Sequence, residues 1–331
     1  MQLVKAFSIK KINLSGPRAW RILALLVLFA GHLQVQGQQL PQFTQFTELR
    51  SYINPAATAT DGLRFGLAGR HQWTGLRNQA GDPAGFRSYM AYTGIPMLKV
   101  NSGVGLLLLA DFADYETTYY ARLNGAHHIK AARDLTLSIG ASFDFIDKTF
   151  DYSQFANDQG TPPWLPFPGR QRASGFDLGT GILLSHQNGS WLGISANNLL
   201  QTTLRYSAFN YRYARQFQIM AGTSIPLIDA RNRSLALLPA LLVHSTQSLS
   251  PQVTAQALLL FNDNFYFGAM YRYQDAIGAV AGLMISNFRV GFSYDYTTSR
   301  LRQAGSMGSP EVTVSWVRPP VRRTRWEGRC Y

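Results

Sequence analysis

Apolar and polar residues alternate with a period of two through long stretches of this chain. Residues 134–147, DLTLSIGASFDFID, place Leu, Ile, Ala or Phe at every second position, with small or polar residues between them. Residues 288–297, FRVGFSYDYT, repeat the pattern, as do 62–73 and 264–274. Successive side chains of a β-strand point to opposite faces, so the pattern predicts strands with one apolar and one polar face.

Composition and strand length indicate which face is enclosed. Hydrophobic residues make up 46% of the chain and charged residues only 15%, against about 25% charged in a typical soluble domain. Each stretch has roughly the ten residues that cross a bilayer when tilted. Aromatic residues such as Trp73, Tyr271 and Trp316 end several apolar faces, as an interfacial girdle does. We therefore expect an all-β protein, a transmembrane antiparallel up-and-down β-barrel of the outer-membrane type, with its apolar face toward lipid.

The connections provide an independent check on a count of fourteen strands. The long connections are expected at 74–84, 148–173, 199–210 and 298–308, and all four follow odd-numbered strands. One even connection, 225–233, is expected to be of moderate length and is an exception. Long extracellular loops and short periplasmic turns are typical of outer-membrane barrels. The expected strands are 62–73, 85–94, 103–112, 115–128, 134–147, 174–187, 190–198, 211–224, 234–246, 249–260, 263–274, 275–286, 287–297 and 309–317.

Both ends of the chain differ from the barrel. Residues 1–37 have a basic beginning, an apolar core at 22–30 and small or apolar Val35 and Gly37 before a cleavage point. This pattern predicts a secretory signal peptide, because nine apolar residues are too few for the ~20 of a membrane helix. Residues 38–61 are expected to be a periplasmic lead-in, 62–317 the barrel, and 318–331 a basic and disordered tail.

Several classes of function find no support. The net charge is +13, but the basic residues are scattered singly along strands, which does not favour nucleic-acid binding. The single cysteine, Cys330, allows neither an internal disulfide nor a zinc site. We find no nucleophile elbow, phosphate-binding loop or metal-ligand spacing, so we expect no enzyme activity and no cofactor.

The polar faces of the expected strands carry charges of both signs. A network of paired charges that braces the lumen is the simpler interpretation, since buried charges persist mainly when paired. A selective pore or a wall that contacts cargo is the alternative. The candidate lumen charges are Arg64, Arg70, Arg87, Glu116, Arg122, Asp144, Asp177, Arg272, Arg289 and Asp295.

The stretch 41–73, PQFTQFTELRSYINPAATATDGLRFGLAGRHQW, resembles the N-terminal motif of the PorP/SprF family of Bacteroidetes. The closing stretch, VGFSYDYTTSRL followed by GSPEVTVSW, is similar to the last hairpin of that family. The residues that match the N-terminal motif are Pro41, Gln42, Phe43, Gln45, Asn54, Pro55, Ala56, Arg70, Gln72 and Trp73.

The resemblance implies an outer-membrane component of the type IX secretion system, which exports adhesins and enzymes and is tied to gliding motility. The implied partners are outer-membrane lipid, the periplasmic ring, a peptidoglycan-binding component and a secreted cargo protein such as an adhesin. For the lead-in, two structures stay open. Phe43, Phe46 and Tyr52 pack into the periplasmic mouth or the lumen, or the segment is a disordered tether.

The loop at 148–173 is the candidate cargo contact, above all Trp164, Leu165, Pro166 and Phe167, which are aromatic or stiffened by proline. A lid folded over the mouth is the alternative role for this loop. A passive pore or transporter for small solutes is the alternative function, and a membrane-embedded hydrolase is a third and weaker one.

Overall fold

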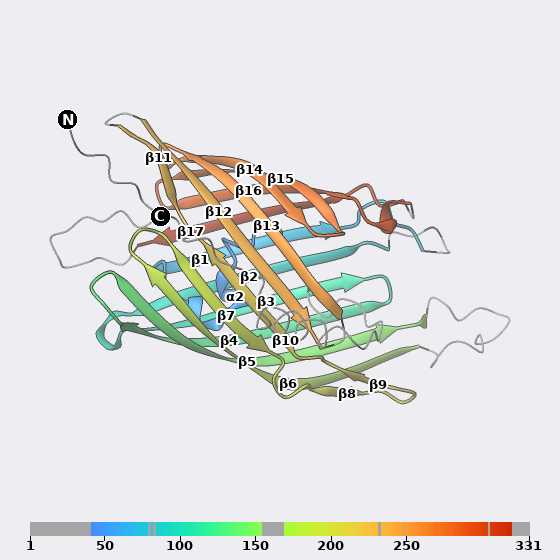
Figure 1. Cartoon of the computed structure of the whole chain (residues 1–331). Coiled ribbons are helices and arrows are strands. Elements are labelled where there is room, and N and C mark those ends of the chain that lie inside the picture. The colour runs from blue at the N-terminus through green and yellow to red at the C-terminus, as the bar shows by residue number, and fades with distance from the viewer. Residues whose placement is uncertain are drawn as a thin grey trace, which may run out of the picture.

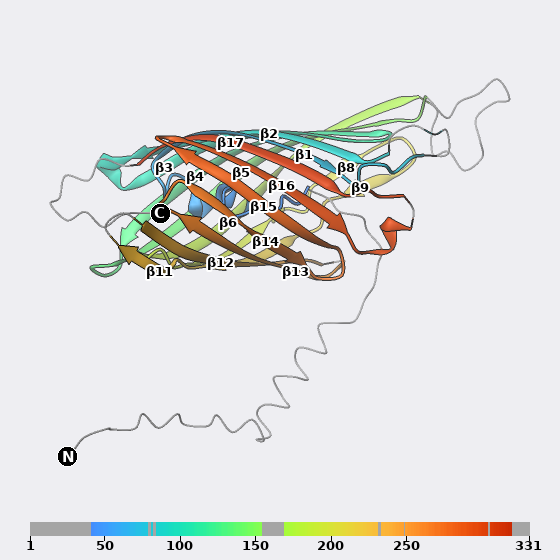
Figure 2. The same ribbon diagram turned by 90° about the horizontal axis from the view of Figure 1, so that it is seen from above.

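The computed structural model describes residues 41–319, apart from 79–80, 82–83, 154–168, 231–232, 248 and 304. Fourteen antiparallel strands form a closed barrel, as expected. Figures 1 and 2 show the strands tilted around a common axis, with the short helix α2 between the walls. None of the described helices has the length and hydropathy of a membrane-spanning helix.

Two sets of strand pairings make the sheet continuous around the barrel. The first strand pairs with the last, in a register that runs from Leu63 opposite Arg318 to Arg70 opposite Glu311. The strand β10 pairs with both β7 and β12. The barrel strands are β1 (Leu63–Gln72), β2 (Phe86–Met97), β3 (Ser102–Ala113), β4 (Glu116–Lys130), β5 (Leu135–Asp151), β6 (Arg170–His186), β7 (Trp191–Asn197), β10 (Gln216–Gly222), β12 (Arg233–Thr246), β13 (Leu249–Phe261), β14 (Phe265–Arg272), β15 (Ala276–Ile285), β16 (Phe288–Thr297) and β17 (Ser309–Arg318).

The alternation places apolar side chains outside and polar side chains inside. Along β16, Phe288, Phe292 and Tyr296 are exposed on the outer face, while Ser293 and Asp295 are buried within the barrel. In a bilayer every backbone N–H and C=O must find a protein partner, and a closed barrel provides one for each strand. The outer face therefore has the apolar surface that lipid requires.

The connections define two ends of the barrel. When the barrel strands are counted in order, the connections after the second, fourth, sixth, tenth and twelfth strands have two to four residues, and we call this end the turn end. The longer connections lie at the other end, the loop end. One of them contains a small hairpin, β8 (Thr203–Arg205) with β9 (Asn210–Arg212), and another contains the 3-10 helix η4 (Arg300–Arg302). A further 3-10 helix, η2 (Leu98–Val100), lies in the turn between β2 and β3.

The expectation for the eighth strand and its following connection was wrong. Residues 225–230 form a strand, β11 (Ile225–Ala230), which pairs with β12 and projects past the neighbouring strands at the turn end (Figure 1). Pro226 lies at a register shift in β11, and proline is tolerated where a strand is an edge or bulged. The moderate connection at 225–233 was the exception to the parity of the loops, and its residues 225–230 form a strand.

A segment of residues 41–62 fills part of the barrel, and we call it the lead-in. It contains the short helix α2 (Arg50–Ile53) and the 3-10 helix η1 (Pro55–Ala57). Phe43, Phe46, Leu49 and Ala56 are at most 4% exposed. The described part of the expected periplasmic lead-in thus lies inside the lumen, because strand side chains bind it there.

Candidate functional site: the occupied lumen

The lead-in is fixed near the loop end by a buried ion cluster. Arg70 of β1 lies 2.7 Å from the carboxylate of Asp295 and 3.0 Å from that of Glu311. Glu311 accepts hydrogen bonds from the backbone N–H of Thr44 at 2.7 Å and of Gln45 at 2.9 Å. The Thr44 hydroxyl donates to Asp295 at 2.6 Å. Strands from both ends of the chain therefore meet around two residues of the lead-in.

A second cluster holds the middle of the lead-in. Arg122 of β4 donates two hydrogen bonds to Asp144 of β5, at 2.7 and 2.9 Å, and a third to the backbone carbonyl of Tyr52 at 2.7 Å. Asn124 donates to the carbonyl of Ser51 at 3.1 Å. Bidentate guanidinium–carboxylate pairs are among the strong polar contacts in proteins, so this cluster fixes both the wall and the lead-in.

The Asn54-Pro55-Ala56 motif presses directly against the barrel wall. The Asn54 side chain donates to the backbone carbonyls of Ile182 and Ile194 and accepts from the N–H of Ala56 at 2.9 Å. Glycines of adjacent strands make room for it. A Cβ atom on Gly181 would lie 2.1 Å from the Asn54 Oδ1, and one on Gly140 would lie 2.3 Å from the backbone nitrogen of Ala56.

A third charged cluster lies at the turn end. Asp61 lies 2.6 Å from Arg50 and 3.3 Å from Arg64, and Glu48 lies 3.4 Å from Arg64 and 3.5 Å from Arg289. Burial alone raises the pKa of the Asp61 carboxyl, but Arg50 and then Arg64 outweigh it and hold that pKa below its ordinary value. For Glu48, burial also raises the pKa, and Arg289 and Arg64 together bring it below the ordinary value.

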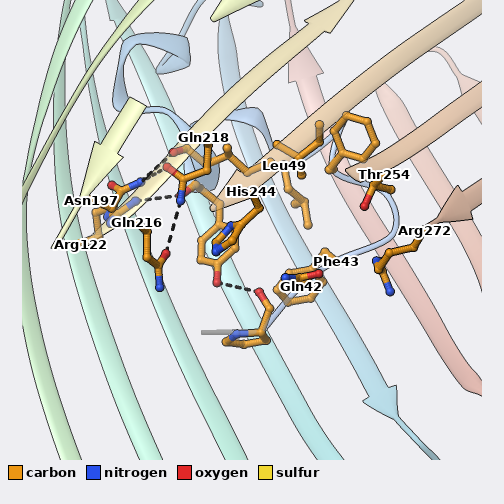
Figure 3. Close-up of a pocket in the computed structure, with 15 residues that line it drawn as sticks. Gln42, Phe43, Leu49, Arg122, Asn197, Gln216, Gln218, His244, Thr254 and Arg272 are labelled. Atoms are coloured by element: carbon orange, nitrogen blue, oxygen red, sulfur yellow. Dashed lines mark hydrogen bonds between the residues drawn. The ribbon is translucent and has the colours of Figure 1, made fainter. Parts of the chain in front are cut away.

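The lead-in crosses the lumen from one end to the other. Thr44 contacts Glu311 and Asp295 near the loop end, whereas a Cβ atom on Gly103, at the turn end of β3, would meet Ala59 and Thr58. Pro41 lines a small cavity of about 40 Å³ with His244, Thr254 and Arg272, which lie toward the loop end of their strands (Figure 3). The chain therefore descends toward the turn end before β1 begins there.

The structure places most of the expected lumen charges on the inner face of the wall. Several of them are buried in ion pairs, namely Arg64, Arg70, Arg122, Asp144, Arg272 and Asp295. Arg289 pairs with Glu48, and the half-buried Glu116 pairs with Lys148. Asp177 is buried without an ion pair among the described residues. Its carboxylate accepts instead from the backbone N–H groups of Leu178, Leu200 and Thr202.

The expectation for Arg87 was wrong. Arg87 is exposed on the outer side of β2, next to the buried Ser88. Ser88, Met90 and Tyr92 form the inner face of that strand, so the strand alternation places Arg87 among outward residues near the loop end.

The family-motif residues come together only in part. Inside the lumen, Gln45 and Arg70 both contact Glu311. Asn54, Pro55 and Ala56 lie together against the wall at Gly140 and Gly181. Pro41 accepts a hydrogen bond from the Tyr52 hydroxyl at 2.9 Å, and the ring of Phe43 packs edge-on against Tyr52. Gln42 lines the small cavity and Gln72 is buried. Trp73 follows β1 at the loop end and packs against Phe86 with ring centroids 5.4 Å apart.

The sequence expectations missed two groups of site residues. Glu311 completes the cluster at Arg70, and the alternation Ser309, Glu311, Thr313, Ser315 already placed it on an inner face. Thr44, Glu48, Arg50 and Asp61 belong to the lead-in, which has no strand periodicity to orient them. The candidate cargo residues Trp164, Leu165, Pro166 and Phe167 lie outside the described residues.

No metal site is present within the described ranges, where no three His, Cys, Asp or Glu side chains gather. The site is therefore a polypeptide held inside a wall by hydrogen bonds and ion pairs. Together with the apolar outer face, this arrangement defines an outer-membrane β-barrel whose lumen is occupied by its own N-terminal segment.

A model of the type IX secretion system membrane protein PorP/SprF matches residues 35–316, and the chain belongs to this family. The resemblance found in the sequence is confirmed. No curated protein matches the chain.

Solved barrels have similar folds. The Ralstonia pickettii toluene transporter TbuX is 9% identical with a TM-score of 0.47, over 80% of this chain and 92% of that one. The CymD monoaromatic hydrocarbon channel is 12% identical with a TM-score of 0.47, over 87% and 96%. A Pseudomonas aeruginosa FadL homologue is 11% identical with a TM-score of 0.44, over 84% and 94%.

We expect Gly181→Ala to loosen the lead-in, because the new Cβ overlaps the Asn54 Oδ1. Overpacking of this kind costs about 1–3 kcal/mol. Limited proteolysis in detergent should cleave between residues 41 and 62 at least tenfold faster than in the wild type. Gly125→Ala is the control, since no heavy atom lies within 4 Å of its Cβ position. Equal cleavage rates in the two variants would contradict this prediction.

Arg70→Met should destabilise the barrel by about 3–5 kcal/mol, because Glu311 and Asp295 then lose a buried partner. The measurement is urea unfolding in lipid vesicles, followed by tryptophan fluorescence. The control is Arg87→Met, which changes an exposed arginine on the outer side of β2 that has no ion pair among the described residues, and which should change stability by less than about 1 kcal/mol. A loss of similar size in both variants would refute a special role for the buried cluster.

Acid should weaken the turn-end cluster. Because the folded pKa of Asp61 is lowered, its contribution to stability is complete above the unfolded pKa of about 4 and is lost as the pH falls below that value. The free energy of unfolding of the wild type should therefore decline more steeply between pH 5 and pH 3 than that of Asp61→Asn, which cannot titrate at this position. Parallel curves for the two proteins would show that Asp61 contributes nothing.

Proposed function

We propose that this protein is a non-enzymatic component of the type IX secretion system in the outer membrane, where it assists the export or cell-surface retention of a secreted cargo such as an adhesin. Its family membership supports the secretion role. The expected signal peptide and the lipid-compatible outer face support the outer membrane as its location. Gliding motility is the cellular process in which such an adhesin would act.

The observation that carries this proposal is the occupied lumen. Charged residues of β1, β4, β16 and β17 bind the lead-in at the loop end, in the middle and at the turn end. A passive pore or transporter for small solutes, the alternative function, needs a continuous water-filled path. A covalently attached segment that spans the bore opposes such a path.

The proposed partners follow from the two ends of the barrel. The turn end would face the periplasm, where the ring and the peptidoglycan-binding component of the system would contact it. The loop end would face the exterior, and the loop that contains Trp164, Leu165, Pro166 and Phe167 remains our candidate contact for the cargo.

Affinity purification from the native outer membrane tests this function. A tagged barrel should co-purify with ring proteins or a large secreted adhesin, whereas an unrelated tagged outer-membrane barrel should not. The same preparation should show little steady conductance in planar bilayers. Recovery of the barrel alone, together with a large and steady conductance, would favour the pore.

A further inference from the structure

The lumen binds the main chain of the lead-in as well as its side chains. Glu311 accepts from two consecutive backbone N–H groups, at residues 44 and 45. Side chains of the wall donate to the carbonyls of residues 48, 51 and 52, and Ser195 and Asn197 both donate to the carbonyl of Ile53, at 2.9 and 3.0 Å. These contacts hold backbone groups of a polypeptide segment.

A cavity of about 450 Å³ lies beside the lead-in in the turn-end half of the lumen. Ser224, Asn264 and Asn287, which belong to turns, and Pro319, which follows β17, line its outer part. The cavity therefore opens at the turn end. Its volume is within the range of about 300–1,000 Å³ that is usual for binding sites.

One wall of this cavity is apolar. Leu238, Leu258, Val280 and Met284 line it from β12, β13 and β15, and Tyr266 lines it from β14. The register places Leu238 opposite Leu258, so the apolar side chains form one continuous patch across neighbouring strands. The inner faces of β4 and β7 also carry Arg122 and Ser195, which bind the lead-in.

The opposite wall is the lead-in itself, and it contains a buried donor without a partner. Gln45 is 1% exposed and lines the cavity. Its side-chain oxygen accepts from Thr313 at 2.9 Å, but its Nε2 has no hydrogen-bond partner among the described residues. Buried polar groups are nearly always paired, so an unpaired amide that borders a cavity indicates a ligand with a hydrogen-bond acceptor.

We propose that this cavity is a second polypeptide site, which receives an extended apolar segment of the secreted cargo from the turn end. The inference rests on the proposed function and names where that cargo binds. An extended chain presents side chains alternately to two sides, so one side packs on the Leu238–Leu258–Val280 wall while main-chain carbonyls face Gln45. The cavity borders a segment whose main chain the lumen wall already binds, which favours a polypeptide over other apolar ligands.

Photocrosslinking in cells tests the position of the cargo. A benzoylphenylalanine at Met284, inside the cavity, should give an ultraviolet-dependent adduct that mass spectrometry identifies as a polypeptide whose export requires this barrel. The same residue at Leu283, which is 48% exposed on the outer face of the same strand, is the matched control and should give no such adduct. An adduct with lipid alone, or with residues 320–331 of the same chain, would overturn the inference.

A cavity-filling variant gives a second measurement. Ala240→Phe narrows the cavity from β12, whereas Leu241→Phe changes an outward side chain that is 41% exposed. In a strain that lacks the chromosomal copy, the first variant should lower cargo export at least tenfold and the second should leave it unchanged, with barrel assembly followed by heat-modifiable mobility on gels. If Ala240→Phe does not assemble, the adduct at Met284 decides.

The outcomes separate the two proposals. Normal export by an assembled Ala240→Phe barrel, in a background where deletion of the gene blocks export, overturns the cavity site and leaves the proposed function standing. Normal export in the deletion strain itself removes the proposed function, and the cavity site falls with it.

Discussion

Buried charges of opposite sign, completed by the main chain of the lead-in, are the constraint on which the interior of this barrel depends. Arg70, Arg122 and Arg272 are each at most 2% exposed, and each is paired with at least one carboxylate. A buried charge that loses its partner is costly. The wall and the lead-in therefore stabilise each other, since each provides groups that the other would leave unsatisfied.

The distribution of polar residues divides the lumen into two regions. Around β4 to β7, and where β16 meets β17 and β1, polar side chains bind the lead-in closely. A small cavity lies beside the part of the lead-in that is near the loop end. Along β12 to β15, apolar side chains face a larger space. The same fold thus combines a firmly held segment with an apolar surface beside it.

The sequence predicted the wall well because the period of a strand is a property of local residues. Alternation identified the closed barrel and the inner position of Arg122, Asp144 and Asp295. It did not show where the eighth strand begins, since 211–215 continue an alternating pattern although 210–212 pair within a loop hairpin. The path of the lead-in depends on contacts between residues far apart in the sequence, such as Thr44 with Glu311, 267 positions away, and no local pattern encodes such contacts.

The position of Thr44 ties the lead-in to the circularisation of the sheet. Its anchors come from β1, β16 and β17, and β1 and β17 become neighbours only when the first and last strands join. An open sheet lacks Arg70 beside Asp295 and Glu311, so it cannot complete this anchor. Complete binding of residues 44 and 45 at this anchor therefore distinguishes a closed barrel from an open assembly intermediate.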